Sequence, residues 1–299
     1  EAKGFTQEEL AKLTGVSFDD YKVLEMGETD FSFTFIYKCA KACGVEVVDL
    51  LEGTSSTLTS FTITRKGEGL KIGFLGGSIT QGCLSSTPET CYAYLVYEWW
   101  KKKFPMAEFT YINAGIGGTT SQFGVARVDK DVLSYEPDVV FIEFSVNDQN
   151  TEFFSETYEG LIRHVYASRT KPAVMLIHNI KYDDGATAEE IHTELGGYYH
   201  LPCVSMKSTI YAMMKRGEIS SRDVTEDDLH PNDVGHGYLS EVITCYLGQI
   251  NEEKDILEEG FEELPNPLTK NAYEYSVRYQ AKDCQPNSKG FLADIREKE

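Results

Sequence analysis

The sequence predicts an α/β protein: a three-layer α/β/α sandwich on a parallel five-stranded sheet, preceded by a small all-α N-terminal domain. From residue 70 to 250, continuous apolar runs alternate with helical patterns, which is typical of a parallel sheet covered on both faces. Residues 1–53 instead show only helical periodicity, broken by glycines. We therefore expect four regions: a helical domain over 1–53, a linker over 54–69, an α/β domain over 70–250 and a C-terminal extension over 251–299.

The first N-terminal helix has a start and a stop in the sequence. Thr6 is placed to cap it, Glu9 completes a capping box, and Gly15 ends it. Ser17 can then cap a second helix that stops at Gly27. The spacing is that of a helix, a tight glycine turn and a helix.

Four motifs occur in this segment: Thr6–Ala11, Gly15–Ser17, Leu24–Gly27 and Ala40–Val45. Through them the segment resembles the helix-turn-helix domain of lambda-repressor-like regulators. In that family the second helix of the motif enters the major groove, but the matching helix here carries Asp19 and Asp20. Residues 1–53 hold 5 lysines and 11 acidic residues, a net charge of −6, whereas DNA affinity depends on basic side chains. We expect no specific DNA binding, and a role in packing, dimerisation or partner contact stays open.

The remaining elements are predicted from composition and periodicity. Residues 54–69 are rich in Ser, Thr and Gly, which indicates a linker with one edge strand at 60–64. For the acidic, then proline-broken and Tyr-rich segment 251–299, a wrap around the core and a small β appendage both stay open. Strands are predicted at 70–75, 109–113, 138–144, 173–178 and 202–205, and helices at 33–43, 91–103, 121–134, 155–168, 186–199 and 233–248.

The composition favours a neutral substrate. With 48 acidic and 28 basic residues, the net charge is −20, which repels nucleic-acid phosphates and anionic membranes. The seven cysteines include no C-x-x-C pair, so the sequence signals neither a disulfide framework nor a zinc site. No apolar run is long enough to span a membrane, and the N-terminus lacks signal-peptide features. We expect a cytoplasmic protein that needs no metal or other cofactor.

Four blocks supply the groups for acyl transfer at a serine: Gly76–Thr80, Asn113–Gly118, Ser145–Asp148 and Asp227–Pro231. The first three blocks follow the first three predicted strands. Because parallel strands end at the same edge of the sheet, where open α/β sheets bind ligands, we expect these blocks to meet there. The chain has neither a phosphate loop nor a complete dinucleotide fingerprint, so a nucleotide site is not indicated.

Through these blocks the α/β region resembles the SGNH, or GDSL, hydrolase superfamily, which has a flavodoxin-like sheet. The resemblance implies that Ser78 is the nucleophile, that His230 is the general base and that Asp227 orients this base. It also implies an oxyanion hole made by the backbone N–H groups of Ser78 and Gly118 and the side-chain amide of Asn147.

One departure from the superfamily pattern narrows the expected substrate. Gly77 stands where many members have Asp, and the subgroup with Gly-Gly-Ser-Ile-Thr and Glu-Phe-Ser-Val-Asn-Asp resembles carbohydrate esterases that remove acetyl groups from sugars. We therefore expect a serine esterase for acetyl or other short-chain esters, with a small-molecule or oligosaccharide ester as substrate. Two alternatives stay open: a lipid esterase or thioesterase of the same superfamily, and a helix-turn-helix regulator whose hydrolase-like domain senses a ligand. We expect no membrane partner, and a homo-oligomer stays open.

Several of these residues also have a plainer interpretation. Ser78 alone could cap a helix, and Asn147 could form an Asx turn with its neighbour. We expect His178, at the end of the fourth strand, to form a wall of the pocket, and His236 to be a helix-start or packing residue. Glu143 lies near the end of an apolar strand, where we expect a buried hydrogen bond that supports the loop of the third block.

Overall fold

The centre of the molecule is a parallel five-stranded sheet with the strand order β2-β1-β3-β4-β5. The computed structural model describes residues 6–25, 38, 39, 41, 69–252 and 264–279. Each adjacent pair of strands is parallel, which confirms the predicted sheet. The strands are β1 (Gly69–Gly76), β2 (Glu108–Gly115), β3 (Val139–Glu143), β4 (Ala173–His178) and β5 (Cys203–Ser205).

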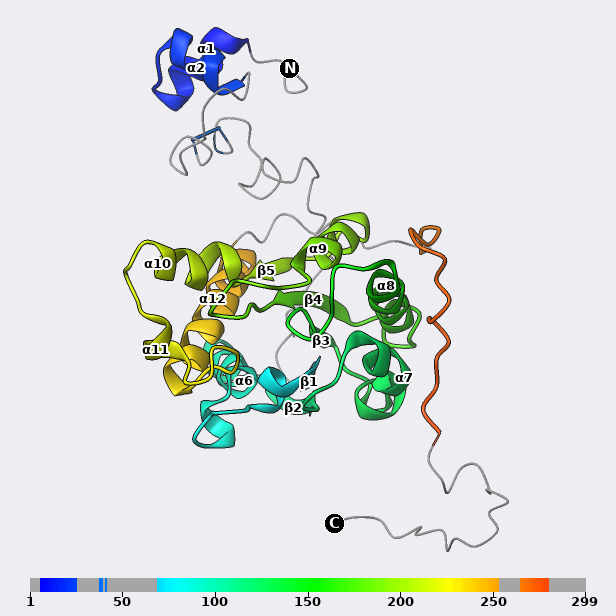
Figure 1. Cartoon of the computed structure of the whole chain (residues 1–299). Coiled ribbons are helices and arrows are strands. Elements are labelled where there is room, and N and C mark those ends of the chain that lie inside the picture. The colour runs from blue at the N-terminus through cyan, green and yellow to red at the C-terminus, as the bar shows by residue number, and fades with distance from the viewer. Residues whose placement is uncertain (1–5, 26–37, 40, 42–68, 253–263, 280–299) are drawn as a thin grey trace, which may run out of the picture.

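Helices cover both faces of this sheet and confirm the three-layer sandwich. Figure 1 shows α6 and α12 on one side of the strands and α7 and α8 on the other. Among the described helices, none is long and apolar enough to cross a membrane. The helices of this region are α5 (Ser78–Gln81), α6 (Tyr92–Lys103), α7 (Ser121–Asp131), α8 (Glu152–Tyr166), α9 (Glu189–Tyr198), α10 (Ala212–Lys215), α11 (Ser221–Val224) and α12 (Asp233–Glu252), with shorter turns η1 (Pro88–Thr90), η2 (Leu133–Tyr135) and η3 (Lys207–Tyr211).

The sheet separates two apolar clusters, and this explains why its strands are almost continuously apolar. Phe74 of β1 and Phe141 of β3 stack with ring centroids 4.7 Å apart, on the face covered by α6 and α12. Leu75 and Ile142, one residue further along the same strands, belong to the cluster under α7 and α8. Because successive side chains point to opposite faces, a strand buried on both sides has few positions for polar residues.

The helix boundaries differ from the predicted ones where local contacts decide them. The helix predicted at 121–134 ends at Asp131, because Val132 leaves helical geometry with φ −133° and is buried, and η2 follows it. Helix α8 begins three residues earlier than predicted, because the Thr151 hydroxyl caps it through the Phe154 N–H. The four-residue helices were not predicted, since they are too short for a periodic pattern.

The first two N-terminal helices, α1 (Gln7–Thr14) and α2 (Phe18–Glu25), form as predicted. Thr6 and Glu9 make the capping box, and Gly15 ends α1 in the left-handed region at φ 70°. The predicted stop at Gly27, most of the third helical run and the edge strand at 60–64 lie outside the described residues.

Residues 264–279, here called the C-terminal strap, lie along α7 and α8 (Figure 1). The buried carboxylate of Glu159 in α8 accepts hydrogen bonds from the backbone N–H groups of Leu268 (2.6 Å) and Thr269 (2.8 Å). Arg163, one turn further along α8, forms an ion pair of 2.8 Å with Glu274. The described part of the C-terminal extension therefore packs against the core, which was one of the two predicted arrangements.

Candidate active site

The first three sequence blocks meet at the carboxyl edge of the sheet. In the observed strand order, the chain leaves β1 toward β2 on one side and reaches β3 on the other, so the topological switch point lies beside β1. Ser78 begins α5 directly after β1, Gly118 lies in the loop after β2, and Asn147 lies in the turn after β3. Ligands of open α/β sheets bind at this position.

Ser78, His230 and Asp227 are joined by a continuous chain of hydrogen bonds. Ser78 Oγ lies 2.8 Å from His230 Nε2, and His230 Nδ1 lies 2.6 Å from Asp227 Oδ2. Since the ionised carboxylate can only accept, Nδ1 carries the proton and Nε2 accepts from the serine hydroxyl. Ser78 is the first residue of α5, after the N-cap Gly77, so its hydroxyl does not cap this helix.

A tight loop fixes the imidazole and its carboxylate. Asp227 Oδ1 accepts the backbone N–H groups of Leu229 (3.0 Å) and His230 (2.7 Å). Partial burial raises the pKa of Asp227. The His230 side-chain hydrogen bond and these backbone bonds outweigh that effect, so the net result is a pKa lowered to about 2. From the neighbouring loop, the Tyr182 N–H donates to the carbonyl of Asp228 at 2.8 Å. The carboxylate is thus ionised and oriented before any ligand binds.

Gly118 and Asn147, the two predicted oxyanion residues outside the serine turn, lie in the segments that follow β2 and β3. Gly118 has a φ of 69°, and a β-carbon built on it would meet no atom within 4 Å, so the space beside its α-carbon is open. Asn147 lies over the turn, since a β-carbon on Gly77 would come within 2.5 Å of Asn147 Oδ1. A side chain at position 77 therefore requires a different Asn147 placement.

Two further residues hold the ends of β1 and β2 beside the serine turn. Asn113 lies inside β2 rather than after it, and its amide donates to the Thr80 carbonyl at 2.8 Å. The fully buried guanidinium of Arg127 donates to the carbonyls of Gly76 (3.0 Å) and Ala114 (2.7 Å). The sequence contained a signal for Arg127, because a charged residue lies three positions after Gly124 on a buried helix stripe.

Glu143 supports the first block, not the third-block loop as predicted. It is fully buried at the end of β3, and its Oε2 accepts from Thr80 Oγ1 at 3.3 Å. Burial raises the pKa of Glu143 to about 7, and the Asp148 charge acts in the same direction. The Asn179 side chain, the Thr80 hydroxyl and the Gly77 backbone oppose this rise. Among the described residues, neither Asn179 Nδ2 nor Glu143 Oε1 has a partner in standard hydrogen-bond geometry.

We expect Glu143→Gln to stabilise the protein at high pH. Below the ordinary pKa of 4.5, the wild-type carboxyl group is neutral in both folded and unfolded chains. Between pH 4.5 and about 7 only the unfolded chain ionises, so wild-type stability falls, by about 3 kcal/mol once both states are ionised. Denaturant unfolding should therefore show a variant that gains on wild type from pH 4.5 to pH 8. A difference that is constant with pH would contradict this, and Glu190→Gln on the surface of α9 is the control.

The other histidines near the blocks have packing roles. His236, in the first turns of α12, is buried against Tyr92, with ring centroids 6.1 Å apart, as expected for a packing residue. His178 was expected to form a pocket wall, but it is fully buried, and its Nδ1 lies 3.4 Å from Thr193 Oγ1. Because the carboxyl end of β4 is buried beneath α9, the side chain of His178 does not border a pocket.

The start of α12 also fastens the loop that follows the nucleophile. Asp233, three residues after His230, accepts hydrogen bonds from Ser86 N (2.8 Å), Ser86 Oγ (2.6 Å) and Thr90 Oγ1 (2.6 Å). These bonds lower the pKa of Asp233 to about 2. The sequence does not reveal this link, because the partners of Asp233 are more than 140 positions away in the chain.

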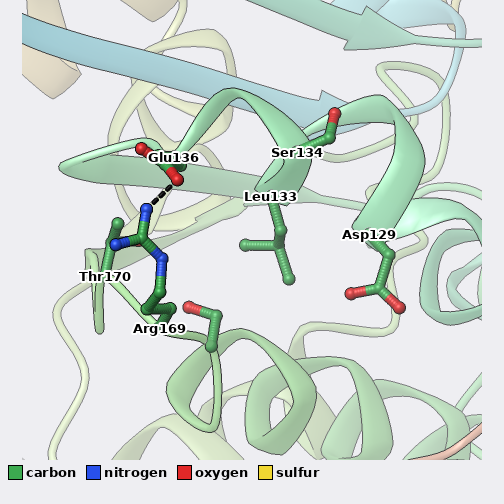
Figure 2. Close-up of a pocket in the computed structure, with 7 residues that line it drawn as sticks. Asp129, Leu133, Ser134, Glu136, Arg169 and Thr170 are labelled. Carbon is green, nitrogen blue, oxygen red and sulfur yellow. Dashed lines mark ion pairs between the residues drawn. The ribbon is translucent and has the colours of Figure 1, made fainter.

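A separate pocket of about 320 Å³ lies at the opposite edge of the sheet, between η2 and the turn after α8. Figure 2 shows Leu133 at its centre and an ion pair between Arg169 and Glu136 at its side. Ser134 donates to a backbone carbonyl, and Ser168 Oγ has no hydrogen-bond partner among the described residues. Because this pocket lacks a serine bonded to a histidine, the carboxyl edge is the better candidate for chemistry.

A family model matches most of the α/β region. Residues 74–238, more than half of the chain, match the model of the GDSL-like lipase/acylhydrolase family. The chain belongs to this family. The family match includes Ser78, Asn147 and His230, and residues 1–50 match the helix-turn-helix family model.

Individual relatives add detail. A crystal structure described as a two-domain esterase active on acetylated mannans is 59% identical, with a TM-score of 0.75. The match covers 78% of this chain but only 62% of that one. The thioesterase 1/protease 1/lysophospholipase L1 of Escherichia coli (strain K12) is 25% identical over 170 residues, 53% of this chain and 74% of that protein. The acetylxylan esterase of Geobacillus stearothermophilus, at 19% identity and a TM-score of 0.52 over 62% of this chain and 96% of its own, shares the fold.

Proposed function

We propose that this GDSL-family hydrolase removes acetyl or other short-chain acyl groups from carbohydrates by serine catalysis. The observation that carries the proposal is the hydrogen-bonded chain from Ser78 Oγ through His230 to Asp227, at the sheet edge where ligands bind. Acetylated mannan is the polysaccharide we propose, because the relative at 59% identity is described as active on it. The net charge of −20 also favours a neutral polysaccharide over an anionic one.

In this proposal Ser78 attacks the acetyl carbonyl carbon while its proton passes to His230 Nε2. Asp227 keeps the imidazole oriented and stabilises its positive charge. The N–H groups of Ser78 and Gly118 and the Asn147 amide receive the negative charge of the tetrahedral intermediate. His230 then gives its proton to the departing sugar oxygen, and a water molecule, activated in the same way, releases acetate from the serine.

The N-terminal helices enter this proposal only as an attached helical module. Asp19 and Asp20 lie exposed in the first turn of α2, and the ammonium of Lys22 lies 4.4 Å from the Phe18 ring centroid. A recognition helix that carries two carboxylates in its first turn repels DNA phosphates. We therefore propose no DNA-binding activity for this N-terminal segment.

Ester chain length and sugar type together test the proposed substrate. With p-nitrophenyl esters, we expect kcat/KM to be highest for acetyl and to fall toward octanoyl. With acetylated manno-oligosaccharides and xylo-oligosaccharides of equal acetyl content, we expect faster acetate release from the manno-oligosaccharides. Since a buried methylene adds only about 0.8 kcal/mol of binding, a site that accepted long chains would show a modest rise per carbon. Activity that rises from acetyl to octanoyl would contradict the proposal and favour a lipid esterase or thioesterase.

A further inference from the structure

Asp148 and His192 form a fully buried polar pair that the catalytic scheme above does not use. Asp148 Oδ2 lies 3.2 Å from His192 Nε2. Its other oxygen, Oδ1, accepts the backbone N–H of Ser121 at 2.9 Å. A buried carboxylate is unfavourable unless it is hydrogen-bonded, so both contacts are needed to keep it in place.

This carboxylate bridges the two segments that carry oxyanion donors. Asp148 directly follows Asn147 in the turn after β3. Ser121 is the first residue of α7 and lies three positions after Gly118 in the loop after β2. No adjacent strand pair joins β2 to β3, because β1 lies between them, so this bond is a direct tie between the two loops.

His192 fixes the orientation of the carboxylate from the α9 side. Its ring stacks on Tyr158 of α8, with centroids 3.5 Å apart and planes 6° apart. Burial lowers the pKa of His192, and the Asp148 bond opposes this, so the imidazole is neutral and donates through Nε2–H. The stacking on Tyr158 and the hydrogen bond to Asp148 together fix the orientation of the imidazole.

We propose that Asp148, held by His192, is a positioning residue that sets the separation between the Gly118 and Asn147 oxyanion donors. The inference rests on the proposed function, because it assumes that these donors receive the developing negative charge. Donors act when they lie about 3 Å from that oxygen, and a displacement of about 1 Å can cost about 100-fold in rate. Substrate binding before the reaction does not need this alignment, so the effect falls on kcat rather than on KM.

A double-mutant cycle tests this coupling. We expect Asn147→Ala to lower kcat by about 10²- to 10³-fold and Asp148→Ala by about 10²-fold, each with KM within about threefold of wild type. Because Asp148 acts partly through Asn147, the double variant should lose far less than the product of the two single losses. Losses that multiply, or a folded Asp148→Ala protein with native kcat, would overturn the inference. Native kcat in Asn147→Ala would instead contradict the oxyanion role in the proposed function.

Two His192 variants decide the matter even if Asp148→Ala does not fold. The His192→Gln variant keeps an N–H donor near the carboxylate, whereas the His192→Phe variant keeps the stacking on Tyr158 and loses the donor. We expect His192→Phe to lower kcat by about tenfold or more at unchanged KM, and His192→Gln to lose at least fivefold less. Thermal unfolding midpoints of both variants are measured alongside. If the two folded variants have equal kcat, the donor to Asp148 does not position the oxyanion hole.

Discussion

Replacing Ser78 with alanine should lower kcat on acetyl esters by about 10⁶-fold and leave the fold intact. The hydroxyl lies 2.8 Å from the His230 imidazole, and as it is the proposed nucleophile, no acyl-enzyme forms without it. Stability should change little, because Ser78 does not cap α5. Initial-rate measurements on p-nitrophenyl acetate, with a denaturation curve for each protein, check both parts.

Ser134→Ala is the matched control for this experiment. It makes the same chemical change in the pocket at the opposite edge of the sheet, where Ser134 Oγ donates to the Lys130 carbonyl. This variant should keep wild-type kcat. Near-native turnover in a folded Ser78→Ala protein would remove the esterase activity from this site altogether.

Replacing Asp227 with asparagine should lower kcat by about 10⁴-fold while the loop keeps its shape. Both carboxylate oxygens accept: Oδ2 from His230 Nδ1, and Oδ1 from the backbone N–H groups of Leu229 and His230. An amide cannot accept on both sides. If its NH₂ faces the ring, the ring proton moves to Nε2, and His230 can no longer take the proton of Ser78.

The neighbouring residue provides a control of the same chemical kind. Asp228 has a φ of 62°, which asparagine also adopts readily, and its carboxylate pairs with Arg222 on the outside of the loop. Asp228→Asn should therefore change kcat by less than about threefold. An equal loss in both variants would mean that loop charge, rather than the orientation of His230, limits the reaction.

The sequence was sufficient for the sheet because the signal for each strand is local. The run at 173–178 coincides with β4, and the other four strands differ from their predicted runs by one or two residues at the ends. Such runs record burial on both faces, which every parallel strand in this fold experiences. Helix α5 was missed because its four residues are held by tertiary contacts, such as the Asn113 amide on the Thr80 carbonyl.

The candidate site, like the sheet, could be predicted only where its sequence signal is local. Ser78, Gly118, Asn147, Asp227 and His230 could be proposed from short motifs, because each motif directly follows a strand or forms one tight loop. Their catalytic roles remain predictions. Supporting pairs such as Asp148 and His192 could not be predicted, because the two residues are joined only by the fold, across 44 positions of sequence. For Glu143, the sequence predicted burial but not the hydrogen bond that it accepts from Thr80.

The C-terminal strap sets the order in which the core can be completed during synthesis. All five strands have been made once residue 205 has been added. Within the described part of the chain, the backbone donors to Glu159 are Leu268 and Thr269, which follow it by 109 and 110 positions. At typical translation rates of about 5–20 residues per second, this carboxylate stays without these partners for roughly 5–20 s. The nascent sheet can therefore assemble before α8 receives its last contacts, and a chain stopped before the strap would carry a carboxylate that has lost these backbone donors.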